Sequence, residues 1–153
     1  MIAQYHIINN NREKIHKLKT MQKNYSMKNK NNNEGKNIDL AITEKEVDGG
    51  KEVDGRITID YPGRFDSLSI NSQIEDSSDV FTYTEIDSKK INHPYARLSI
   101  LKKDLQDPKT IKFKAFTRHI PKSTESNVKF RVTLIQEHKE IASNVKFIKI
   151  KKN

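Results

Sequence analysis

The sequence predicts an all-β fold, an antiparallel β-sandwich of 7–8 strands that follows a disordered N-terminal arm. Three observations indicate this fold. From Ile38 onward, apolar residues alternate with polar ones at a period of two. Turn-forming residues interrupt the alternation about every 8–12 residues, and this spacing is typical of sandwiches and barrels. Residues 1–37 lack the alternation. We therefore assign residues 1–37 to the arm and residues 38–153 to the sandwich domain.

Composition and charge are unevenly distributed along a chain whose 153 residues suit one domain. Only 33% of the residues are hydrophobic and 32% are charged, so the apolar residues have to be concentrated in part of the chain to form a core. Residues 1–37 hold eight Lys/Arg and two Asp/Glu, residues 38–108 nine and fifteen, and residues 109–153 twelve and three. The net charge of +9 therefore averages a basic–acidic–basic order, which favours an anionic partner.

The arm is rich in Lys and contains nine Asn, so it cannot bury enough apolar surface to offset the entropy of ordering it. Within it, Ile15, Leu18, Met21 and Tyr25 fall near helical spacing. Two interpretations stay open. The arm is a solvated tail, or it forms a short basic amphipathic helix on an anionic membrane or nucleic acid.

The chain has no Cys, which excludes disulfide bonds and thiolate metal sites. No apolar run reaches the length of about 18 residues that a membrane-spanning helix needs. Gln4, Tyr5 and His6 interrupt the apolar residues near the start, unlike a secretory signal. We expect a soluble, cytoplasmic protein without a transmembrane segment.

The alternation predicts eight strands, at residues 38–42, 57–61, 68–74, 80–86, 96–101, 111–115, 128–134 and 145–150. The parity of the last strand shifts at Phe147–Ile148, which predicts a β-bulge there. We interpret residues 135–143 as a loop or single turn, and His93-Pro94 as a separator between strands. The sequence E-V-D-G occurs at 46–49 and again at 52–55, and we interpret this repeat as a long hairpin loop.

One segment carries a resemblance to a known family. Residues 57–70 read as a strand, a Tyr61-Pro62-Gly63 turn and a second strand. This segment resembles the second and third strands of arrestin-type sandwich domains. The resemblance implies an immunoglobulin-like sandwich rather than a closed barrel. Arrestins carry two sandwiches and this chain has one, so the resemblance carries over no family function.

Basic residues on two of the clearest strands form the candidate binding site. If the strands at 111–115 and 128–134 are neighbours in one sheet, their outward side chains form a positive patch that contains one aromatic ring. Such a patch suits an anionic or protein partner. The alternative is a solvated sheet face on which Lys residues protect the edges from aggregation. The predicted binding residues are Lys112, Lys114, Phe116, Arg118, Lys129 and Arg131.

Motifs for catalysis are missing from the sequence. It contains no G-x-S-x-G, no P-loop and no G-x-G-x-x-G, so we expect no catalytic residue, no metal and no cofactor. Our first interpretation is a non-enzymatic interaction module. One alternative is a nucleic-acid-associated protein that uses the arm and the basic face, and steep salt dependence of binding would favour it. The other is a hydrolase-type enzyme with a carboxylate/His site at His119, Glu137 and His138.

Acidic loops provide a further alternative. Sandwich domains bind calcium through loop carboxylates, and calcium takes six to eight oxygen ligands. No loop here matches the EF-hand pattern, and Asp is a default residue of turns. The loop residues concerned are Glu75, Asp76 and Asp79, Asp48 with Asp54, and Asp104 with Asp107.

Overall fold

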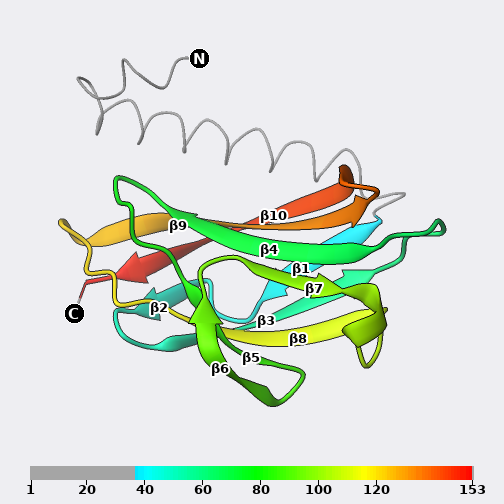
Figure 1. Cartoon of the computed structure of the whole chain (residues 1–153). Helices are drawn as coiled ribbons and strands as arrows, with labels where there is room; N and C mark the ends of the chain where they lie inside the picture. Colours follow the sequence, from blue (N-terminus) through cyan, green and yellow to red (C-terminus); the bar gives the residue numbers. More distant parts are fainter. Residues whose placement is uncertain (1–36, 153) are drawn as a thin grey trace.

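The computed structural model describes residues 37–152, which form a sandwich of two five-stranded sheets (Figure 1). Among these residues the only helical segment is a 3₁₀ turn, Lys102–Asp104. The all-β prediction is therefore confirmed. The predicted arm and its amphipathic stretch lie outside the described residues, except for Asn37.

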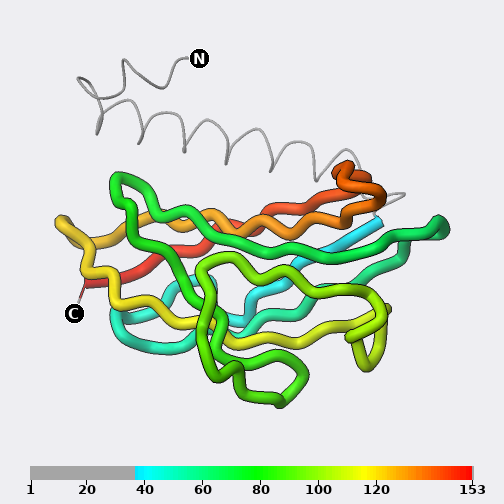
Figure 2. Tube along the Cα trace, viewed as in Figure 1, coloured from blue at the N-terminus to red at the C-terminus, as the bar shows by residue number. Residues whose placement is uncertain are grey.

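Each sheet contains five strands, and no strand belongs to both sheets. The first sheet has the order β1 (Ile38–Ile42), β3 (Glu52–Ile59), β8 (Thr110–Phe116), β5 (Thr82–Ile86) and β6 (Lys89–Tyr95). The second sheet has the order β2 (Glu46–Asp48), β10 (Lys139–Lys151), β9 (Glu125–Gln136), β4 (Ser67–Ile74) and β7 (Leu98–Leu101). Figure 2 traces how the chain crosses between them.

Eight of these ten strands pair only in the antiparallel sense. β2 runs parallel to β10, whereas every other pair is antiparallel. The sequence predicted an antiparallel sandwich of 7–8 strands, and the two strands that it missed are β2 and β6. β2 has only three residues, too few for an alternation to be recognised. β6 is exposed on both faces at most positions, so it has no apolar stripe.

The core lies between the sheets because the strands alternate inward and outward residues. β3 shows this most regularly, with every second residue buried. Two aromatic pairs pack in the core: the ring centroids of Phe81 and Phe130 lie 4.9 Å apart, and those of Tyr83 and Phe113, both in the first sheet, lie 5.7 Å apart. Burial of each large apolar side chain stabilises the fold by about 1.5–3 kcal/mol.

Gly55 makes room for one of these rings. It lies directly opposite Phe113 in the β3–β8 pair. A Cβ atom at this position would be 2.0 Å from the Phe113 ring, far inside van der Waals contact. Glycine is therefore required here so that the Phe113 ring can pack against the backbone of β3 in the core.

Two tight hairpins were not predicted from the sequence, and one of them replaces a predicted loop. Residues 135–143 are not a loop, because β9 continues to Gln136 and β10 begins at Lys139. The two residues between them, Glu137 and His138, have φ of 50° and 65°. Asp87 and Ser88, which join β5 to β6, have φ of 47° and 69°. Two successive left-handed residues make the type I′ turn that matches the twist of a hairpin.

The predicted separator at His93-Pro94 is also wrong, because both residues lie inside β6. β6 is the last strand of the first sheet. Proline lacks an amide N–H and is tolerated on such an edge, where no further strand needs that donor. The proline therefore marks an edge strand and does not end it.

The predicted bulge at Phe147–Ile148 is absent, since the β9–β10 register runs evenly from Ala142 to Lys151. The register shifts instead between Glu140 and Ala142. Ile148 joins the core cluster, and Phe147, one residue earlier, points to the other face of the strand. The change of parity in the sequence reflects apolar residues on both faces of β10.

The E-V-D-G repeat is not a hairpin loop. Its first copy contributes Val47 to β2 in the second sheet, and its second copy contributes Val53 to β3 in the first sheet. Both valines belong to the core. The repeat therefore places one valine from each sheet into the same core, with the chain crossing between the sheets at Gly49–Gly50.

Tyr83→Phe is expected to stabilise the protein. Tyr83 is fully buried and its hydroxyl has no hydrogen-bond partner among the described residues. Burial also raises the pKa of this hydroxyl. Because an unsatisfied buried hydroxyl costs about 1–3 kcal/mol, the free energy of unfolding in urea should rise by about 1 kcal/mol. Tyr95→Phe, at a side chain 55% exposed, is the control and should change it by less than about 0.5 kcal/mol. A loss of stability on Tyr83→Phe would show that the hydroxyl is satisfied.

Candidate functional site

Four of the six residues predicted to form one basic face lie on two opposite faces. β8 belongs to the first sheet and β9 to the second. Lys112 and Lys114 alternate with buried residues of β8 and so project from the outer surface of the first sheet. Lys129 and Arg131 alternate with buried residues of β9 and project from the outer surface of the second. The assumption that these strands are neighbours is therefore wrong, and the structure does not bring the six residues together.

Carboxylates balance two of these cations. The Nζ atom of Lys114 lies 3.9 Å from Asp54 Oδ1 and 3.9 Å from Glu85 Oε2. Arg131 pairs with Glu140 on the neighbouring strand. Exposed ion pairs such as these contribute little stability, but they reduce the positive potential of each sheet face.

Phe116 and Arg118 lie elsewhere, at the end of β8, where they line a hollow of about 420 Å³. We call this hollow the end groove. Three connections and strand ends meet there: the β2–β3 turn, the start of the β8–β9 connection and the end of β10 (Figure 1). Its lining residues are Gly49, Gly50, Phe116, residues 118–121, Lys151 and Lys152.

Apolar side chains line part of the end groove. Ile120 is 72% exposed, compared with 55% for Tyr95 and 48% for Leu101. Pro121 beside it is buried, and Phe116 is half-buried. Gly50 closes the β2–β3 turn with φ of 85°, a conformation that favours glycine. The absence of a side chain at Gly50 keeps this wall of the groove low.

Cations border the end groove. Lys151 is held by Glu125, at 2.9 Å, and by Glu46, at 3.5 Å. Hydrogen bonds from Lys149 and Lys151 lower the pKa of Glu125 to about 2. Arg118 and Lys152 differ, because within residues 37–152 neither has a carboxylate within 4.0 Å. Two cations of the groove are therefore available to an anionic group.

A buried histidine fixes the wall of the end groove. His119 Nδ1 lies 2.9 Å from Asp79 Oδ2, and His119 Nε2 lies 3.0 Å from Ser126 Oγ. In the neutral form with the proton on Nδ1, the ring donates to Asp79 and accepts from Ser126. Thr117 adds a second tie, since its hydroxyl donates to the carbonyl of Val80 at 2.9 Å. The β8–β9 connection is thereby attached to the β4–β5 connection and to the start of β9.

This Asp–His–Ser order has the sequence of contacts found in serine hydrolases, but the surroundings do not suit that chemistry. Ser126 is only 6% exposed. The hollow beside it measures about 60 Å³, room for about two waters. Glu75, Asp76 and Glu125 line the same hollow with Lys122, and three carboxylates against one ammonium group would destabilise an oxyanion. The contacts therefore serve to hold the connection in place.

The residues proposed for a hydrolase-type site do not meet. Glu137 and His138 form the β9–β10 turn. His119 contacts Ser126, at the opposite end of β9. At 3.3 Å per residue, the eleven steps from Ser126 to Glu137 span roughly 35 Å. Sequence reasoning named His119 as a catalytic candidate and Asp79 as a calcium candidate, but it did not predict their contact and missed Ser126, because partners 40 and 7 residues away leave no spacing signal.

The acidic loops do not form a metal centre. Glu75 Oε1 accepts hydrogen bonds from the backbone and side-chain N–H groups of Asn127, and Asp79 is bound to His119. Across residues 37–152, no three His, Asp or Glu side chains are grouped closely enough to hold a metal ion. The structure thus gives the calcium alternative no support. In the same part of the chain, no helix is long and apolar enough to cross a membrane.

No protein-family model matches the chain, and no curated protein matches it. Solved structures do. The adhesin CfaE of enterotoxigenic E. coli superposes with a TM-score of 0.50 at 14% identity, over 76% of this chain and 48% of the CfaE chain. This chain thus spans about half the length of that adhesin. The likeness shows the β-sandwich fold.

Other solved structures are similar at lower scores. The human F-spondin reeler domain has a TM-score of 0.47 at 11% identity, over 75% of this chain and 89% of that one. AvmM, which catalyses macrocyclization in alchivemycin A biosynthesis, has a TM-score of 0.45 at 8% identity, over 78% and 91%. A fold does not by itself determine activity, so activity has to be argued from the site.

Asp79→Asn is expected to destabilise the protein at neutral pH and to have no effect in acid. The hydrogen bond from His119 lowers the pKa of Asp79. A carboxylate with a lowered pKa stabilises the fold above its ordinary pKa of about 3.9, and this contribution is lost as the pH falls through the lowered value. Because Asp79 is 58% exposed, we expect a loss below about 1 kcal/mol at pH 7.

The measurement is the free energy of unfolding in urea for both proteins between about pH 3 and pH 7. Asp60→Asn, at an exposed side chain, is the control for a change of charge alone. An equal loss at both ends of the pH range would contradict the role of the Asp79 carboxylate.

Proposed function

We propose that this chain is a non-enzymatic interaction module that binds an acidic, partly apolar segment of a protein partner in the end groove. The observation that carries the proposal is the combination of a strongly exposed isoleucine, Ile120, with two cations that have no carboxylate partner among the described residues. Both features belong to one hollow of about 420 Å³.

The apolar part of the end groove supplies binding energy. An exposed aliphatic side chain beside a half-buried aromatic one is costly to keep in water, and a partner that covers both removes this cost. Each Å² of apolar surface covered is worth about 25 cal/mol. Ile120 and Phe116 are therefore the expected anchors, with Pro121 as a rigid support.

The charged part supplies orientation. Arg118 and Lys152 flank the apolar residues and lie on different segments of the chain. A carboxylate on each side of an apolar side chain would meet one of these cations. Such complementarity steers association and selects against basic partners. Lys151, already held by Glu125 and Glu46, contributes less.

The strand order supports an immunoglobulin-like assignment of the sandwich. In immunoglobulin domains one sheet has the order A-B-E-D and the other contains C-F-G. The order β1-β3-β8-β5 of the first sheet and β4-β9-β10 of the second fit these patterns. The arrestin-type resemblance of residues 57–70 stays a prediction, with Tyr61-Pro62-Gly63 located between β3 and β4.

A protein partner is favoured over nucleic acid. The nucleic-acid alternative relied on one continuous basic face, and β8 and β9 lie in different sheets. The arm, on which that alternative also relied, lies outside the described residues. A cytoplasmic location fits a chain without Cys, and we keep it as part of the proposal.

The proposal is tested by selecting a displayed library of random peptides on the full chain. Peptides that combine Asp or Glu with apolar residues should be enriched. Ile120→Asp should weaken their binding at least ten-fold, because it removes the anchor and adds a repelling charge. Leu101→Asp, at an exposed side chain of β7, is the matched control and should leave the affinity within about two-fold.

The charges are tested separately with Arg118→Glu combined with Lys152→Glu, compared with Lys89→Glu combined with Lys90→Glu on β6. Only the first pair should weaken binding. Enrichment of peptides without acidic residues, or equal losses in both pairs, would contradict the proposed groove. Binding of mixed RNA in preference to any peptide would favour the nucleic-acid alternative.

A further inference from the structure

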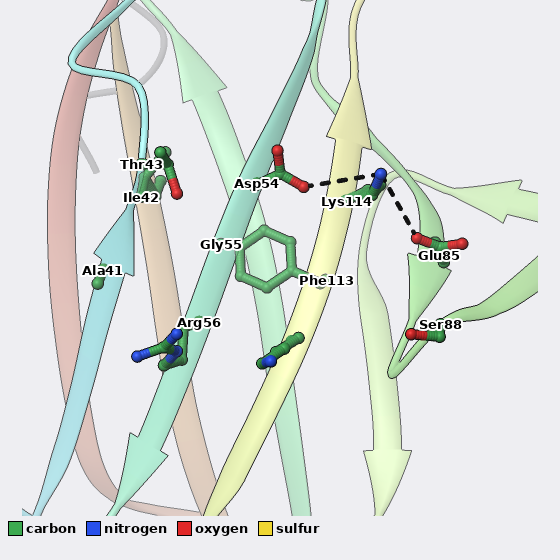
Figure 3. A pocket seen from close by; sticks show the side chains of 11 residues that line it. Ala41, Ile42, Thr43, Asp54, Gly55, Arg56, Glu85, Ser88, Phe113 and Lys114 are labelled. Atoms are coloured by element: carbon green, nitrogen blue, oxygen red, sulfur yellow. Dashed lines mark ion pairs between the residues drawn. The ribbon is translucent and has the colours of Figure 1, made fainter.

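A second hollow lies on the outer surface of the first sheet, away from the end groove. It measures about 380 Å³ and is formed by β1, β3, β8 and the β5–β6 hairpin (Figure 3). Its lining on β8 runs from Lys112 to Lys114, and it shares no lining residue with the end groove. The two hollows can therefore be altered independently.

Two cations face each other in this hollow. Arg56 of β3 and Lys112 of β8 are directly opposite in the strand register. Both are exposed, and within residues 37–152 neither side chain has a carboxylate within 4.0 Å. Like charges directly opposite on neighbouring strands destabilise a sheet. An anion held between them would remove this repulsion.

The neighbouring row of the sheet is balanced, which makes the cation pair stand out. Asp54 lies opposite Lys114, and Lys114 lies 3.9 Å from both Asp54 and Glu85. Figure 3 shows these three side chains together, beyond Arg56. Asp87 is the other acid nearby, and its carboxylate accepts from the backbone N–H of Lys112 at 2.9 Å.

A small residue leaves space open beside the cation pair. Ala41 of β1 lies opposite Arg56 on the same outer face. Thr43 and Ser88 stand on the rim with their hydroxyl groups. The hollow thus has a cationic side at Arg56 and Lys112. Its other side offers hydroxyl and carboxylate groups that can hydrogen-bond to alcohols.

We propose that this hollow binds a small phosphorylated polyol. Arg56 and Lys112 take the phosphate, for which the guanidinium and ammonium groups are the preferred side chains. The phosphate fills only part of the hollow, whose volume is about 380 Å³. The remaining space brings the hydroxyl groups of the ligand to Thr43 and the carboxylates of Asp54 and Glu85, in the neighbouring row. Lys114 limits the repulsion between those carboxylates and the phosphate.

The test is a ¹⁵N NMR titration of the full chain with three probes: glucose 6-phosphate, inorganic phosphate and glucose. Glucose 6-phosphate should shift the amide signals around Arg56 and Lys112 in a saturable way, with a Kd on the order of 1 mM or below. Inorganic phosphate should bind at the same place more weakly, and glucose should cause no shift. Equal affinity for the two phosphates would overturn the polyol part of the proposal.

A matched pair of variants locates the site. Arg56→Gln combined with Lys112→Gln should weaken binding of both phosphates at least ten-fold, with the other signals unchanged. Lys89→Gln combined with Lys90→Gln, on the adjacent hairpin, removes the same charge and should change the affinity less than two-fold. Equal losses in both pairs, or shifts that do not saturate, would overturn the proposal and indicate general attraction to a basic surface.

Discussion

The crossing of the chain from β8 in the first sheet to β9 in the second determines which surface each of the later basic residues occupies. After Phe116 the chain leaves the first sheet, and at Glu125 it enters the second. The buried ring of His119 holds this crossing through Asp79 on one side and Ser126 on the other. Without these contacts the connection would have to place a polar ring between the sheets unsatisfied, at a cost of about 1–3 kcal/mol.

Because of this crossing, the basic C-terminal third of the chain is divided among three surfaces. The cations of β8 face outward from the first sheet and those of β9 from the second, while Arg118 and Lys152 border the end groove. No single face collects the charge that the sequence concentrates. Two smaller candidate sites remain: the end groove, and the hollow that contains Arg56 and Lys112.

The strands were predictable where one face is buried. The alternation located β8 and β9 correctly, but of β3, Glu52–Ile59, it found only residues 57–59, because residues 52–55 were assigned to a loop. The failures have physical causes. The type I′ turns at Asp87-Ser88 and Glu137-His138 use residues other than the usual Asn-Gly, and β6 is exposed on both faces. The sheet to which a strand belongs depends on contacts distant in sequence, so alternation alone could not show that β8 and β9 are separated.

The separation of β8 and β9 is best tested by distance measurement between spin labels, which the absence of Cys in the chain makes simple. Lys112→Cys and Lys129→Cys would carry one label each. The labels would project from the outer faces of two sheets packed about 10 Å apart. Double electron–electron resonance should therefore give a distance between the two labels beyond about 20 Å. The pair Arg56→Cys and Lys112→Cys, opposite in one sheet, should give a much shorter one. A similarly short distance for Lys112 and Lys129 would show that they share a face and would contradict the account.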